Sequence, residues 1–147
     1  MKNILVAVDL DPTDQFLLSP AIELAQKFHS KIWIIHIAAP EPDFVGYRVG
    51  PSYIRESRAE ELRKEHVELQ NMMKHAQGLS IEAEALLIQG PTVDMLELEI
   101  KKLQIDLLIM GSRRHGFLYN TFVGHTSVKL MKTQLIPILL IPLSDEN

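Results

Sequence analysis

The sequence predicts an α/β fold, a doubly wound five-stranded parallel sheet with helices on both faces. One observation is a set of five short apolar runs, at Ile4–Val8, Ile32–Ile37, Ile81–Ile88, Ile105–Met110 and Ile136–Ile141. All but the third are rich in Ile, Val and Leu with little alternation, which is typical of strands covered on both faces. The other observation is that helical periodicity fills the intervals between the runs. Crossovers of this length join parallel strands in a right-handed sense.

Length and composition limit the class of protein. The 147 residues contain no linker or internal repeat, so we expect a single domain over residues 1–147. The absence of cysteine excludes disulfides and thiolate zinc sites. A net charge of −4 without a long basic run argues against nucleic acid as a partner. The apolar run near the N-terminus is too short for a signal peptide or a membrane span, so we expect a cytoplasmic protein that binds no membrane.

The first strand leads into the acidic stretch "DLDPTD", in which Asp11 before Pro12 is typical of a turn or a cap. Pro20 leaves two alternatives open, since the first helix either begins there or is kinked there. After the second strand, residues 38–53 read "AAPEPDFVGYRVGPSY". This segment is long for a connection in a compact domain. It is either a surface loop or a lid over a ligand, with Phe44 or Tyr47 as its apolar contact.

The next elements are a long helix, a strand and a shorter helix. The long helix is expected from near Ser52 to just before Gly78, with one face formed by Leu62, His66, Leu69, Met73 and Ala76. The third run, "IEAEALLI", has glutamates on one side, which indicates a strand with one face partly solvated. The shorter helix follows "QGPT", and we expect Thr92 as its N-cap. Its apolar face is formed by Val93, Leu96, Ile100 and Leu103.

Residues 111–127, "GSRRHGFLYNTFVGHTS", have the composition of a phosphate-binding loop. We expect the fourth strand to end at Met110, Gly111 to begin the loop and Gly124 to open the last helix. The amides at a helix start favour an anion by about 0.3–2 kcal/mol, and glycine lets a backbone approach phosphate oxygens closely. Thr126 and Ser127 can cap this helix or donate hydroxyls. From these residues alone, a phosphate site and a structural loop remain alternatives, because neither GxxxxGK[ST] nor GxGxxG is present.

Along almost its whole length, the sequence resembles the universal stress protein family. The resemblance lies in "ILVAVDLD", "IIHI", "IQGPTVDMLELEIKKLQIDLLIMGS", "HGFLYNTFVG" and "IPILLIP". It implies a Rossmann-like sandwich with the strand order 3-2-1-4-5. The nucleotide-binding branch of the family carries G-x₂-G-x₉-G-[ST] after the fourth strand, and Gly111 and Gly124 match its first and third glycines. Arg114 stands at the second glycine, two residues before Gly116. His125 stands at the hydroxyl position, followed by Thr126.

These departures leave the ligand open. Arg114 adds bulk where a backbone would pass under a phosphate, but Arg113 and Arg114 are also strong phosphate partners by chemistry. His125 still supplies a backbone amide at the helix start. The resemblance implies ATP or AMP, with magnesium accompanying the phosphates, in a sensor or regulatory module that acts on an unknown protein partner. The alternative is a nucleotide-free dimeric interaction protein in which residues 111–127 form a structural loop.

Asp9, at the end of the first strand, is either a turn residue or, as the resemblance implies, a contact to ribose or adenine. The resemblance also implies that Val8, Ile37 and Met110 lend backbone groups or apolar walls around the base. The expected nucleotide-binding residues are Val8, Asp9, Ile37, Met110, Gly111, Arg113, Arg114, Gly116, Gly124, His125, Thr126 and Ser127.

The sequence contains no nucleophile elbow, no HExxH and no marked acid–base pair of carboxylates, so we predict no catalytic residue. Slow ATP hydrolysis stays open. His36 and His66 have no partner at metal-ligand spacing, and we expect both to be packed or surface residues.

The last strand carries Pro137 and Pro142, and proline in a strand is largely confined to sheet edges. An apolar edge has to be covered, and a second copy related by a two-fold axis would cover it. We therefore expect a homodimer joined through residues 136–143, with Ile138, Leu140 and Ile141 at or beside the contact. The family resemblance implies the same arrangement.

Overall fold

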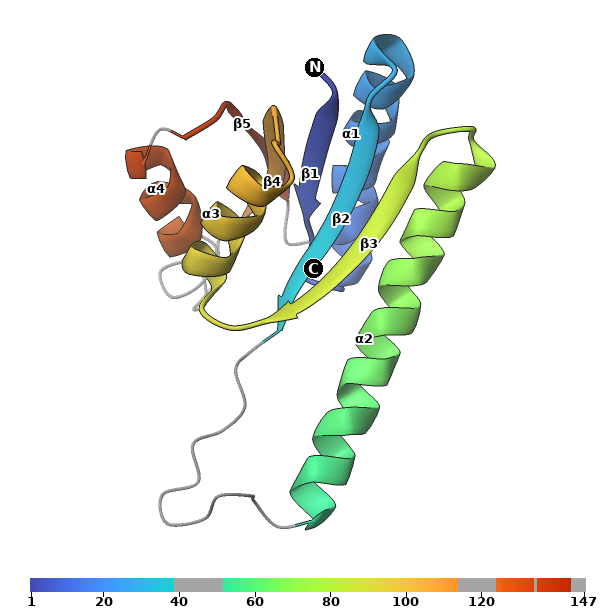
Figure 1. Cartoon of the computed structure of the whole chain (residues 1–147), viewed down its shortest axis with the longest axis vertical. Coiled ribbons are helices and arrows are strands. Elements are labelled where there is room, and N and C mark those ends of the chain that lie inside the picture. Colours follow the sequence, from blue (N-terminus) through green and yellow to red (C-terminus); the bar gives the residue numbers. More distant parts are fainter. Residues whose placement is uncertain (39–51, 114–123, 134, 144–147) are drawn as a thin grey trace.

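A computed structural model of the protein describes residues 1–38, 52–113, 124–133 and 135–143 (Figure 1). Five parallel strands form one sheet in the order β3-β2-β1-β4-β5, which confirms the predicted fold class and strand order. The strands are β1 (Asn3–Ala7), β2 (Lys31–Ala38), β3 (Ala83–Gln89), β4 (Leu107–Arg113) and β5 (Ile138–Leu143). The helices are η1 (Pro12–Asp14), α1 (Gln15–Phe28), α2 (Ser52–Gly78), α3 (Thr92–Lys102) and α4 (Gly124–Thr133).

Two hydrophobic cores lie on opposite faces of the sheet. Helices α1 and α2 cover one face, and α3 and α4 cover the other (Figure 1). Along β1 the side chains alternate between the two cores: Ile4 and Val6 pack with α1 and α2, whereas Leu5 packs with α3 and α4. All three are fully buried. Burial of both faces explains why β1 and β4 appear in the sequence as apolar runs without alternation.

The first helix begins before Pro20, which decides against one of the two alternatives for this residue. The Asp11 side chain caps η1 by accepting the Thr13 N–H at 2.7 Å, and Asp14 completes a capping box. Helix α1 then runs from Gln15, so Pro20 lies inside it, and a start at Pro20 is wrong. The cap at Asp11 initiates helical backbone well before the proline.

Thr92 is not the N-cap of α3. It is the first residue of the helix, and Pro91 occupies the cap position without a side-chain cap hydrogen bond. The fixed φ of proline, here −62°, already sets the entry into the helix. The predicted apolar face is confirmed: Leu96 and Ile100 are buried, and Val93 and Leu103 are partly buried.

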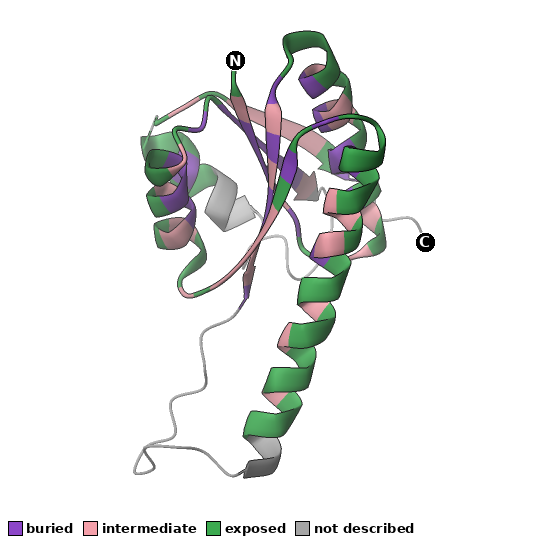
Figure 2. Ribbon diagram, turned by 45° about the vertical axis from the view of Figure 1, so that its right-hand side comes forward, coloured by how far each residue is buried: buried purple, intermediate pink, exposed green. Residues whose placement is uncertain are grey.

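Helix α2 matches the predicted long helix, and its amino-terminal turns extend past the carboxyl ends of the strands (Figure 1). Leu69 and Ala76 are buried on its packed face, whereas His66 is exposed. Most of its amino-terminal half is exposed, because the sheet ends before the helix does (Figure 2). Among the described residues, no helix combines the length and the apolar character needed to cross a membrane.

Strand β4 does not end at Met110 as predicted, but continues to Arg113. The reason is its partner: β5 runs parallel to it as far as Leu143, with Gly111 opposite Ile141 and Arg113 opposite Leu143. Gly111 is therefore a strand residue. The prediction that Gly111 begins the loop is wrong.

We expect Gly111→Ala to destabilise the protein by about 1–3 kcal/mol, the usual cost of overpacking a core. A Cβ at Gly111 would collide with the Cδ1 of Leu143 and lie 3.1 Å from its Cγ. Leu143 is 4% exposed and the adjacent Leu17 2%, so neither side chain has room to move away. Denaturant unfolding measures the change. Gly78→Ala is the matched control, because nothing lies within 4 Å of its Cβ position. Equal stability of the two variants would contradict the assignment of a packing role to Gly111.

Candidate functional site

The candidate site lies where the winding of the sheet reverses. From β1 the chain proceeds to β2 and β3 on one side, and then crosses to β4 and β5 on the other. Open α/β sheets bind ligands at the carboxyl ends of the strands beside such a reversal, here β1 and β4. Asp9 follows β1 by two residues and is exposed. Helix α4, which follows β4 in the chain, begins at Gly124 as predicted.

A buried carboxylate supports the turn that carries Asp9. The Asp14 side chain accepts the backbone N–H of Asp9 at Oδ1 (3.2 Å) and the backbone N–H of Asp11 at Oδ2 (3.0 Å). Asp14 is 2% exposed, and this burial raises the pKa of its carboxyl to about 6, although both amide hydrogen bonds act to lower it. Asp14 was not predicted as a site residue. The sequence feature that could have pointed to it is the spacing Asp11-x-x-Asp14, which is that of a capping box.

The end of β1 is also anchored to β2. The backbone N–H of Val8 donates to the carbonyl of Ile35 (2.9 Å), and the Nδ1–H of His36 donates to the carbonyl of Val8 (2.8 Å). The Nε2 of His36 lies 3.9 Å from the Oε1 of Glu65 on α2. His36 is thus a packed residue, as predicted, and it connects strand β2, the end of β1 and helix α2. Its role in fixing Val8 was missed, because register between strands is not visible in a single sequence.

The three residues expected around the base do not share one face of the sheet. Val8 is 4% exposed and belongs to the core under α1 and α2. Met110 is 5% exposed and Ile37 is partly buried, and both pack on the opposite core with α3 and α4. The structure therefore brings Ile37 and Met110 to the same face, whereas the side chain of Val8 is on the other.

The remaining predicted residues belong to the end of β4, to the start of α4 or to the residues between them. Gly111 and Arg113 lie in β4, and the backbone of residues 124–127 forms the first turn of α4. Arg114 and Gly116 fall outside the described residues, as do Phe44 and Tyr47 of the proposed lid. For these four the predictions stand as sequence-based expectations.

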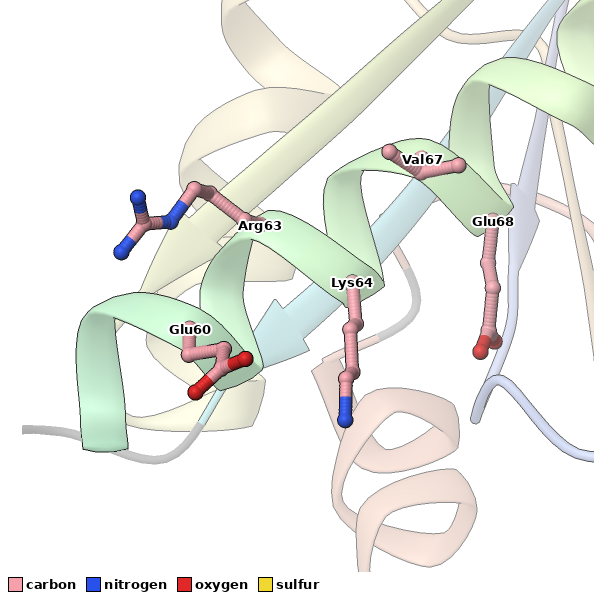
Figure 3. Close-up of a pocket in the computed structure, with 5 residues that line it drawn as sticks. All are labelled: Glu60, Arg63, Lys64, Val67 and Glu68. Atoms are coloured by element: carbon pink, nitrogen blue, oxygen red, sulfur yellow. The ribbon is translucent and has the colours of Figure 1, made fainter. Parts of the chain in front are cut away.

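A pocket of about 730 Å³ lies elsewhere, along the amino-terminal half of α2. Its described lining is Glu60, Arg63, Lys64, Val67 and Glu68, all from this one helix (Figure 3). Two acidic and two basic side chains form a wall of balanced charge, and none of these residues was predicted as a site residue. Among the residues that the structure places, no three acidic or histidine side chains are arranged to hold a metal ion.

The chain is similar to proteins of known family. The model of the universal stress protein family matches residues 1–142. The universal stress protein A homolog of Haemophilus ducreyi is 30% identical over 147 residues, covering 99% of both chains. A universal stress protein family structure from Burkholderia pseudomallei has a TM-score of 0.71 at 22% identity, covering 97% of this chain and 96% of that one.

Some structural relatives hold nucleotides. A family protein from Arabidopsis thaliana with AMP bound has a TM-score of 0.65 at 17% identity, covering 97% of this chain and 92% of that one. Two further universal stress protein structures, complexes with cAMP and dAMP, have TM-scores of 0.68 and 0.63. At this level of identity these structures establish the fold, while the match over residues 1–142 establishes the family. The chain belongs to the universal stress protein family.

Proposed function

We propose that the protein binds an adenine nucleotide, ATP or AMP, at the carboxyl ends of β1 and β4, and serves as a sensor or regulatory module in the cytoplasm. The observation that carries this proposal is the exposed Asp9 at the reversal of strand order, on a turn hydrogen-bonded to Asp14, with the start of α4 following the neighbouring strand. Relatives with the same fold bind AMP, cAMP and dAMP. The nucleotide state would alter the contact with a protein partner.

The proposed roles follow from the chemistry of each group. The Asp9 carboxylate accepts hydrogen bonds from the ribose hydroxyls or the adenine amino group, and Ile37 and Met110 offer apolar surface to the base. The amides of residues 124–127 meet the phosphates at the amino terminus of α4, where four backbone N–H groups have no partner within the helix. Arg113 and Arg114 supply cations for the phosphates. A magnesium ion enters only as the companion of those phosphates.

Native mass spectrometry of freshly purified protein tests the proposal. We expect the 16.7 kDa chain to carry the additional mass of an adenine nucleotide. Calorimetric titration of the nucleotide-stripped protein with ATP and AMP should give saturable binding, and GTP, which lacks the adenine amino group, should bind more weakly. Absence of a bound nucleotide together with flat titrations would overturn the proposal. The nucleotide-free interaction protein would then be the better description, and β5 favours that second candidate because it lies at the sheet edge with half-buried apolar residues.

A further inference from the structure

The turn between β1 and η1 holds a residue in an unfavourable conformation. Leu10, between Asp9 and Asp11, has φ 61°, in the left-handed region that side chains other than glycine rarely adopt. Such a conformation costs about 1–2 kcal/mol per residue and persists only where its surroundings enforce it. The Asp14 carboxylate enforces it, because its two oxygens accept the amides on either side of Leu10, from Asp9 and Asp11.

Asp14 therefore controls the backbone from which Asp9 projects. If Asp14 lost one acceptor oxygen, the amide of Asp9 or Asp11 would lose its partner and the strained turn would relax. We propose that Asp14 is a positioning residue of the nucleotide site, an inference that rests on the proposed function. Its ionised carboxylate fixes the turn through which Asp9 meets the nucleoside.

The negative charge of Asp14 and its positioning role have opposite effects on the affinity for an anionic nucleotide, so a variant can distinguish them. Among the described residues, the charged groups acting on Asp14 are Asp9 and Asp11, and both are negative. If Asp14 mattered only as a charge, removing it would reduce repulsion and tighten the binding of an anionic nucleotide. A positioning role predicts weaker binding.

The test is titration with AMP of wild type, Asp14→Asn and a matched control, Asp106→Asn. Asp106 also accepts two backbone amides, from Lys2 (2.6 Å) and Asn3 (3.0 Å), but these lie before and at the start of β1, at the amino edge of the sheet. At pH 7.5 we expect Asp14→Asn to bind AMP about tenfold more weakly, as expected for losing one hydrogen bond to a charged group. Asp106→Asn should match the wild type.

The pH profile separates positioning from a general structural effect. Because the pKa of Asp14 is about 6, roughly a tenth of it is ionised at pH 5, and wild-type affinity should fall about fivefold relative to the variant between pH 7.5 and pH 5. The difference between wild type and Asp14→Asn should thus shrink to about twofold at pH 5. The phosphate of free AMP titrates in the same way in the experiments with all three proteins, so it does not affect the ratio of their affinities.

Amide chemical shifts of the wild type provide a measurement that needs no variant. The Asp9 and Asp11 amide signals should titrate together with a midpoint near 6, and AMP should lower that midpoint. A midpoint that AMP raises or leaves unchanged, or tighter AMP binding by Asp14→Asn, would overturn this inference and leave nucleotide binding intact. Failure of the wild type to bind AMP at any pH would overturn the proposed function, and the inference with it.

Discussion

Gly124→Val is expected to abolish adenine-nucleotide binding while the fold survives. Gly124 is the first residue of α4, at the carboxyl edge of the sheet, where the proposed phosphates meet amides that have no partner within the helix. A branched Cβ there would occupy the space through which a phosphate oxygen reaches the backbone. We expect the affinity for ATP to fall at least about 100-fold, which corresponds to roughly 2.7 kcal/mol.

Gly78→Val is the matched control for this experiment. It makes the same change in a helical glycine at the opposite edge of the sheet, where a Cβ meets nothing within 4 Å. Calorimetric titration measures affinity, and thermal unfolding followed by circular dichroism verifies that both variants are folded. Unchanged ATP affinity in folded Gly124→Val would exclude close approach of phosphate to this backbone.

The central strands were predictable because burial on both faces requires runs of Ile, Val and Leu with little alternation. Their ends were less predictable, because they depend on partners distant in the sequence. Strand β4 extends to Arg113 only because β5 provides a parallel partner up to Leu143. The composition of residues 111–113, glycine followed by polar residues, gives no sign of a strand. The missing side chain of Gly111 accommodates Leu143, a packing reason that the loop interpretation did not include.

The features of the candidate site that depend on local sequence were predictable. Asp9 could be placed from its position after the first run, and the start of α4 from Gly124. Asp14 and His36 were not recognised as supports of the candidate site. The supporting role of Asp14 depends on the burial of its side chain, which the sequence of a polar residue does not reveal. The role of His36 depends on the strand register that places it beside the carbonyl of Val8. The roles of Arg113 and Arg114 remain predictions of chemistry and resemblance.

The second large effect concerns assembly through β5. This strand is last in the sheet order, and among the described residues only β4 pairs with it. Ile138, Leu139, Leu140 and Ile141 are all only half-buried, although each packs on one of the two cores. A second copy related by a two-fold axis would cover this edge and bury the remaining apolar surface. We therefore expect the wild type to sediment as a dimer at micromolar concentration, at twice the 16.7 kDa of the chain.

Leu140→Lys should shift this equilibrium to the monomer, because a lysine at the contact would be buried without a partner carboxylate, at a cost of several kcal/mol. The dissociation constant of the dimer should rise about 100-fold if the contact loses about 2.7 kcal/mol of binding free energy. Leu135→Lys is the control: the same change at a 38% exposed residue ahead of the strand should leave the dimer intact. Since Leu140 also packs on the core of α3 and α4, circular dichroism must show that the variant is folded. A wild type that sediments at 16.7 kDa, or a folded Leu140→Lys that remains dimeric, would exclude β5 as the contact.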